Sequence, residues 1–162
     1  MDHNKLAALF RKLGARDPES WAKSQVEEGI PQLARFLFLR QAWRSVVAED
    51  DPKWIEQVIA RAASHPGEPY TGVGSSLVSL RKRGATDAEI TDFVRGMQAE
   101  FLFQLCYLLD DPGDVGQEVA NVMWALVQTD EDGNVLNTIG GLHESVLETD
   151  PTGREMRPRG AG

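Results

Sequence analysis

The residue types that most often carry chemistry are few and scattered in this sequence. His3, His65 and His143 lie far apart and form no His-x-x-x-His pair. We therefore expect no zinc site, because zinc needs several ligands at defined spacing. Cys106 is the only cysteine and lies in an apolar run, where burial raises the pKa of a thiol and makes it unreactive. These residues predict no metal and no catalytic group.

Two short segments have the composition of ion-binding or phosphate-binding loops. If Gly133 took the sixth position of a calcium loop, Gln128 and Ile139 would take the first and twelfth, and neither supplies a carboxylate. The segment 72–76, Gly-Val-Gly-Ser-Ser, could hold an anion at a helix start. It lacks the spacing of a nucleotide-binding loop. We expect a turn and a helix start, and no cofactor.

The charge is strongly acidic. The sequence has 25 Asp and Glu against 17 Lys and Arg, a net charge of −8. Such a field repels nucleic acid and anionic lipid and attracts a basic partner, although acidic surfaces also simply keep proteins soluble. Three acidic turns form a candidate partner-binding patch if they share one face, and otherwise are ordinary solvated turns: Glu49, Asp50, Asp51; Asp110, Asp111, Asp114; Asp130, Glu131, Asp132.

Neither the amino-terminal residues nor any later segment indicates secretion or a membrane span. The first residues carry no signal peptide pattern. The longest nearly apolar run, 101–109, has nine residues, whereas about 20 are needed to span a bilayer. A single cysteine also favours a reducing compartment. We expect a soluble, cytoplasmic protein.

Start and stop signals divide the chain into helices. Asp17-Pro18 and Asp51-Pro52 are typical helix starts, and Thr86 with Glu89 forms a capping box. Gly29-Ile30-Pro31 should break a helix. With the apolar spacing, these signals predict helices over about 6–13, 17–29, 32–48, 51–62, 73–83, 86–109 and 115–127.

The carboxyl-terminal part gives weaker signals. Residues 135–149 suit either a short helix or a strand that pairs back across Asp132-Gly133, and we favour a helix over 142–148. The last residues hold three arginines and little to bury. We therefore expect one helical domain over 1–150 and a mobile tail over 151–162.

Several segments of the chain are repeated in the same order. Residues 11–19 match 81–89 at six of nine positions. Phe-Leu-Phe at 36–38 recurs at 101–103, and Asp-Asp-Pro at 50–52 recurs at 110–112. Self-similarity of this kind indicates a duplicated unit. We expect an all-α bundle of six to eight helices, built as two three-helix units over about 4–64 and 73–128 with an extension over 129–150.

The middle helix of each unit should be buried. The runs 36–39 and 101–109 are apolar on nearly all sides, and a helix of that kind belongs in a core. Arg35 and Glu100 precede the two Phe-Leu-Phe triplets. They could pair across an axis that relates the two units.

Two classes of function fit these observations. The first is a non-catalytic protein-binding domain, such as an acidic inhibitor or an immunity-type protein that neutralises a basic partner, for example a bacterial toxin. The alternative is a small-molecule-binding bundle or an enzyme with a pocket between the central helices. Self-association is compatible with both. The pocket would be lined by Arg40, Arg44, Glu100, Gln104 and His143.

Overall fold

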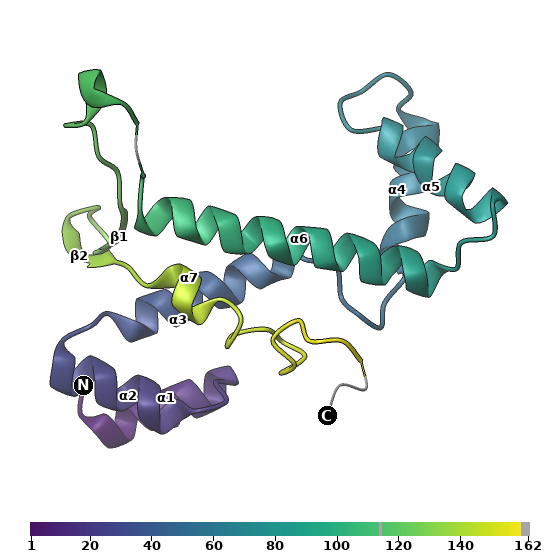
Figure 1. Ribbon diagram of the computed structural model, residues 1–162. Helices are drawn as coiled ribbons and strands as arrows, with labels where there is room; N and C mark the ends of the chain where they lie inside the picture. The colour runs from purple at the N-terminus through teal and green to yellow at the C-terminus, as the bar shows by residue number, and fades with distance from the viewer. Residues whose placement is uncertain (114, 160–162) are drawn as a thin grey trace. The chain divides into compact units, whose positions relative to one another are not determined.

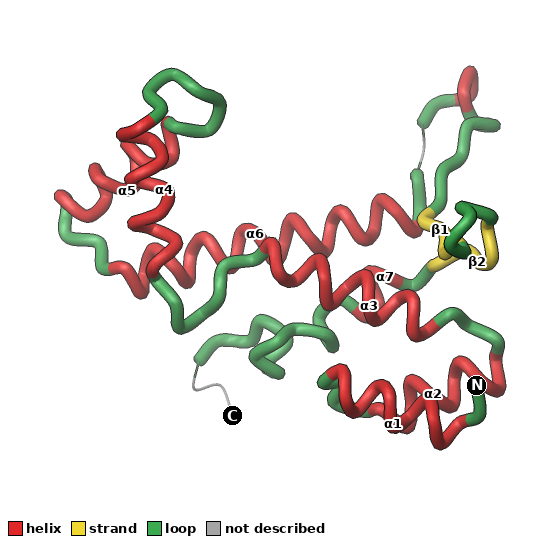
Figure 2. Tube along the Cα trace, turned by 180° about the vertical axis from the view of Figure 1, so that it is seen from behind, coloured by secondary structure: helices red, strands yellow, loops and turns green. Residues whose placement is uncertain are grey.

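The computed structural model describes residues 1–113 and 115–159 of the chain. The chain is a mostly helical domain with a small two-stranded hairpin near its carboxyl end (Figures 1 and 2). Within the described ranges, seven α-helices form: α1 His3–Leu13, α2 Pro18–Glu28, α3 Gln32–Ala42, α4 Lys53–Ser64, α5 Gly72–Lys82, α6 Asp87–Asp110 and α7 Leu142–Ser145. None of these helices is long and apolar enough to cross a membrane.

The predicted bundle of six to eight helices is confirmed, and the hairpin is an addition to the all-α prediction. Strand β1 (Leu126–Thr129) pairs antiparallel with β2 (Val135–Ile139). The contacts divide the chain into two compact units. The first unit comprises residues 1–44 and the described residues from 100 onward, and the second comprises residues 45–99.

The core of the first unit is an aromatic cluster. The rings of Phe10, Trp21 and Phe36 lie 5.4–5.8 Å apart, centre to centre, and come from α1, α2 and α3 respectively. Each aromatic side chain buries a large apolar area, so this cluster contributes strongly to the stability of the first unit. Trp43 donates from its ring nitrogen to the backbone carbonyl of Val146 at 2.9 Å. This bond helps to hold α7 beside α3 (Figure 1).

The core of the second unit joins α4, α5 and the first part of α6. Ile55, Leu77 and Ile90 are its buried apolar centre. Gly74 lies where α5 approaches α4, and a Cβ at this position would lie 2.4 Å from Cβ of Ala62. The glycines of segment 72–76 therefore include one that the packing of two helices requires.

The repeated segments 11–19 and 81–89 have the same local structure. Gly14 and Gly84 both end a helix in the left-handed conformation, with φ of +90° and +96°. In each turn the following residue, Ala15 or Ala85, donates its backbone N–H to the carbonyl five residues earlier, at 3.0 and 3.2 Å. This is a Schellman-type helix end, which favours glycine because only glycine adopts a positive φ without strain.

The helix starts predicted at Asp17 and Thr86 and the predicted break are confirmed. The helix predicted to start at Asp51-Pro52 begins at Lys53, with Pro52 at the N-cap and no side-chain cap. Thr86 Oγ1 accepts from the backbone N–H of Glu89, and Glu89 accepts in return from the backbone N–H of Thr86. Asp17 accepts from the backbone N–H of Ser20 at 3.1 Å. Between α2 and α3, Gly29 has a φ of +72° and Pro31 precedes the first helical residue.

The predicted helix over 115–127 is wrong. This segment contains only a 3₁₀ turn, Gln117–Val119, before strand β1 begins. Gly116 has a φ of +92°, which a helix does not contain. Most apolar side chains of the segment, including Val122 and Met123, are exposed. A short helix is stabilised mainly by packing of its apolar face, and most of the apolar side chains of this segment are not packed against the core.

Two expectations about the middle helices also need correction. Phe36 is buried, but Phe101 is 68% exposed, so the 101–109 run is not buried on all sides. Arg35 is directed to α7, where its Nη1 lies 3.5 Å from Ser145 Oγ. No ion pair between Arg35 and Glu100 is present in the described chain.

The carboxyl-terminal alternatives are both represented, in different places. Residues 135–139 form a strand, and α7 occupies the first part of the favoured helix 142–148. The helix predicted over 32–48 ends at Ala42 and continues as a 3₁₀ turn, Trp43–Ser45.

Candidate functional site

The three acidic turns have different environments. Glu49, Asp50 and Asp51 belong to the second unit, and the other two turns belong to the first. Asp111 is exposed, and its carboxylate accepts from the backbone N–H of Gly113 at 2.8 Å. Asp114 lies outside the described residues. That the acidic turns share one face stays a prediction.

The hairpin loop contains the third acidic turn. One carboxylate oxygen of Asp130 accepts from the backbone N–H groups of Asp132 and Asn134 at 3.0 and 2.8 Å. The side-chain amide of Asn134 donates to the other carboxylate oxygen at 2.9 Å. This bond, followed by the backbone bond from Asn134, lowers the pKa of Asp130. Glu131 and Asp132 are exposed beside it. The turn therefore presents carboxylates to solvent at the tip of the hairpin.

Asp110 is not an exposed member of an acidic patch. Its side chain is 6% exposed, and its Oδ2 accepts from both the backbone N–H and Nδ1 of His143, at 2.9 and 2.6 Å. Tyr107 packs its ring edge-on against His143 with centres 4.9 Å apart. Asp110 thereby joins the end of α6 to the start of α7.

Other ionisable side chains surround this buried pair. Burial lowers the pKa of Arg35, and the nearby carboxylates of Asp110 and Glu144 oppose that shift. Burial, and secondarily Asp110, raises the pKa of Cys106 to about 11, which agrees with the unreactive thiol that the sequence predicts. No cluster of potential metal ligands occurs among the described residues. We interpret the group as a structural connection between α3, α6 and α7.

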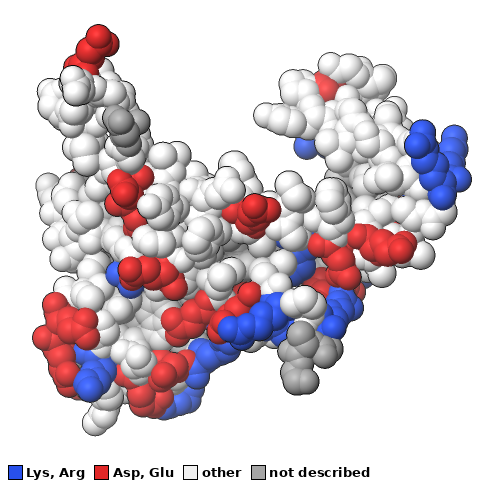
Figure 3. Space-filling model, viewed as in Figure 1, with Lys and Arg blue, Asp and Glu red and all other residues white. Residues whose placement is uncertain are grey.

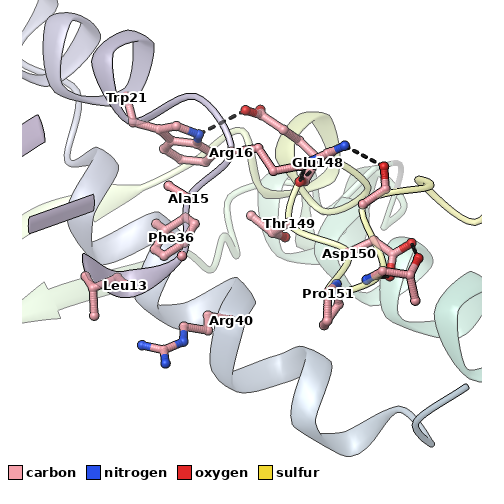
Figure 4. A pocket seen from close by; sticks show the side chains of 13 residues that line it. Leu13, Ala15, Arg16, Trp21, Phe36, Arg40, Glu148, Thr149, Asp150 and Pro151 are labelled. Carbon is pink, nitrogen blue, oxygen red and sulfur yellow. Dashed lines mark hydrogen bonds between the residues drawn. The ribbon is translucent and has the colours of Figure 1, made fainter. Parts of the chain in front are cut away.

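A pocket of about 350 Å³ lies between α1, the α1–α2 turn, α3 and the segment that follows α7 (Figure 4). Trp21 donates from its ring nitrogen to the Glu148 carboxylate at 2.9 Å. Arg16 donates to the backbone carbonyls of Glu148 and Gly153, at 2.6 and 2.7 Å. These bonds fix one wall, so part of the predicted mobile tail is anchored. Residues 160–162 of that tail lie outside the described residues.

One of the five residues expected to line a pocket lines this one. Arg40 does so. Arg44 bonds to Gln41 on the surface, and His143 is paired with Asp110. Glu100 and Gln104 are exposed on α6. The structure therefore does not bring the five together.

Comparison of the chain with protein-family models, with curated proteins and with solved structures finds no match in any of the three. The functional inference therefore depends on the residues of this chain alone.

One signal that the sequence analysis missed is the uneven distribution of charge. Between Arg95 and Arg154 the sequence contains eleven Asp and Glu and no Lys or Arg. The remaining residues have fourteen Asp and Glu against seventeen Lys and Arg. The net charge of −8 thus comes entirely from residues 96–153. In Figure 3, blue patches are mixed with red ones over α1 and α2 and along the carboxyl-terminal segment, and another blue patch lies over the end of α5.

The same acidic stretch carries a large exposed apolar surface. On α6, Phe101 and Leu108 are 68% and 48% exposed, while Leu102 and Cys106 face the core. The ring nitrogen of Trp124 donates to the backbone carbonyl of Leu108 at 2.8 Å, which places this exposed tryptophan at the end of α6. The other exposed apolar residues of the stretch are Leu105, Tyr107, Val119, Val122, Met123, Val127, Val135 and Leu136. Large exposed apolar patches typically mark interaction sites, so the exposed apolar residues of this stretch are candidates for such a site.

Proposed function

We propose that this chain is a non-catalytic protein-binding domain whose partner presents a basic surface. The observation that carries the proposal is the charge of residues 96–153, which contain eleven carboxylates and no Lys or Arg. A region of one sign attracts a partner of the opposite sign and raises the rate of encounter. An inhibitor or immunity-type protein that covers a basic partner, such as a bacterial toxin, is the specific form that we favour.

The exposed apolar side chains in the same stretch supply the second requirement of a stable complex. Charge steers the partner, but burial of apolar surface contributes most of the affinity. Phe101, Met123 and Trp124 are of the residue types enriched in the centres of protein interfaces. The acidic field disfavours nucleic acid and anionic membranes as partners.

The test is capture of partners from a native lysate at low and high salt, followed by titration of each purified captured protein. The wild-type chain is compared with a variant in which exposed carboxylates of the acidic stretch are neutralised: Asp111→Asn, Glu118→Gln, Glu131→Gln and Asp132→Asn. We expect a basic protein whose affinity falls with salt and falls further in the variant. Equal affinity of both forms at every salt concentration would contradict the proposal.

The pocket beside Arg40 supports a second candidate function, the binding of a small anionic molecule. Apart from Arg40, the charged side chains of the pocket, those of Arg16, Glu148 and Asp150, are engaged in bonds within the chain. A volume of about 350 Å³ lies at the lower end of the range for small-molecule sites. A screen of small carboxylates by thermal shift, with Arg40→Ala as the matched variant, tests it. A shift that Arg40→Ala leaves unchanged would contradict this site.

A further inference from the structure

The exposed apolar residues at the end of α6 form a row along the helix. Phe101, Leu105 and Leu108 are spaced by four and three residues, which places them on one helical face. All three are exposed, and the row extends about 10 Å along the helix axis. The ring of Trp124 adjoins its carboxyl end through the bond to the Leu108 carbonyl. We call these four residues the α6 row.

Carboxylates lie at both ends of the α6 row. Glu100 directly precedes Phe101, and Asp111 follows Leu108 three residues later. Both side chains are exposed. Beyond them the nearest Lys or Arg in sequence are Arg95 on one side and Arg154 on the other. Within residues 96–153, an occupant of the row therefore meets an apolar centre flanked by carboxylates and by no Lys or Arg.

We infer that the α6 row binds an amphipathic helix of a partner protein, with apolar side chains on the row and Lys or Arg against Glu100 and Asp111. This inference rests on the proposed function and names the shape of the partner. Anchors spaced four and three residues apart on one helix match the spacing of apolar side chains on a second helix. The charge of the rim selects a basic helix, because a like-charged one would be repelled.

The probe is a fluorescently labelled peptide of Leu and Lys at amphipathic helical spacing, titrated into the full chain and followed by anisotropy. Two control peptides replace Lys by Glu or Leu by Ser. We expect the Leu and Lys peptide alone to bind with measurable affinity. Binding of the Glu peptide with equal affinity would overturn the role of the acidic rim.

Matched variants locate the site. Leu108→Ser removes an anchor that is 48% exposed, and Leu80→Ser on α5 removes a leucine that is 44% exposed in the other unit. We expect Leu108→Ser to weaken peptide binding about tenfold or more and Leu80→Ser to leave it unchanged. Equal effects of the two variants would overturn the inference.

A third variant separates failure of the α6 row from failure of the proposed function. Glu100→Gln with Asp111→Asn should weaken binding and reduce its salt dependence. If that variant weakens binding while Leu108→Ser does not, the row is the wrong site and a basic partner is still supported. If neither variant changes binding, the inference about the α6 row fails, and the proposed function is decided separately by the captured partner and the variant with four neutralised carboxylates. Sedimentation of the free chain adds one more test. If the chain is a dimer and Leu108→Ser dissociates it, the α6 row binds a second copy of this chain, and the inference is overturned.

Discussion

The two Phe-Leu-Phe triplets have the same sequence and opposite orientations. In α3, Phe36 is 5% exposed and Leu37 is exposed. In α6, Leu102 is 5% exposed and Phe101 is exposed. The first triplet thus directs its first phenylalanine to the core, and the second triplet directs its leucine there.

The difference follows from what each helix packs against. Phe36 meets the rings of Phe10 and Trp21, whereas Phe101 is 68% exposed. The preceding residues differ in the same sense, since Arg35 is buried and Glu100 is exposed. An apolar triplet therefore indicates a helix with apolar surface to bury. Which face of that helix is buried depends on the elements that pack against it. We propose that the side left exposed in α6 is used for binding.

The largest expected effect comes from truncating the two phenylalanines. Phe36→Ala should reduce the free energy of unfolding by about 3–5 kcal/mol, because it leaves a cavity in an aromatic cluster. Phe101→Ala should change it by no more than about 0.5 kcal/mol, as is typical of surface positions. Urea denaturation followed by circular dichroism measures both. Similar losses in the two variants would mean that Phe101 is a core residue.

The next effect concerns the ends of the helices that carry the triplets. Asp110→Ala at the end of α6 should cost about 1–3 kcal/mol, since it leaves the backbone N–H and ring nitrogen of His143 without their acceptor. Glu131→Ala, an exposed acid in the hairpin turn, is the control and should be nearly neutral. The same denaturation experiment measures both variants. An Asp110→Ala variant as stable as wild type would contradict the proposed stabilising connection between α6 and α7.

A smaller effect is expected where the helices begin. α6 begins with the Thr86 capping box, whereas α3 begins after Pro31 with no side-chain cap. Thr86→Ala should therefore cost about 1 kcal/mol. Hydrogen exchange of the first turn of α6 should also accelerate in Thr86→Ala. Unchanged exchange there would show that the cap does not stabilise the helix start.

The smallest effect is a pH dependence of the same cap. Bonds from the backbone N–H and then the hydroxyl of Thr86 lower the pKa of Glu89 below its ordinary value. A lowered folded-state pKa stabilises the folded state above the unfolded-state pKa, and this contribution disappears as pH falls through the folded-state pKa. The stability difference between wild type and Glu89→Gln should therefore be present at neutral pH and vanish in acid. A difference that persists unchanged in acid would contradict the assignment.

Local signals predicted most of the helices but not the surface that we propose to be functional. Asp17, Gly84 and the Thr86–Glu89 pair mark helix ends through bonds within a few residues, so the sequence alone contains them. The partners of Asp110 and Arg35 are on α7, far along the chain, and no local pattern indicates them. The exposure of Phe101 depends on the absence of a packing partner. The charge distribution over 96–153 was legible in the sequence and could have indicated the region.

The most direct test of the central claim is a methyl NMR titration of the chain with the Leu and Lys peptide. We predict that the methyl signals of Leu105, Leu108 and Met123 shift with the peptide concentration, while those of Leu13 and Thr149 at the pocket remain unchanged. Shifts confined to the pocket, or to Leu80 and its surroundings in the second unit, would contradict the assignment of the exposed face of α6 as the binding surface.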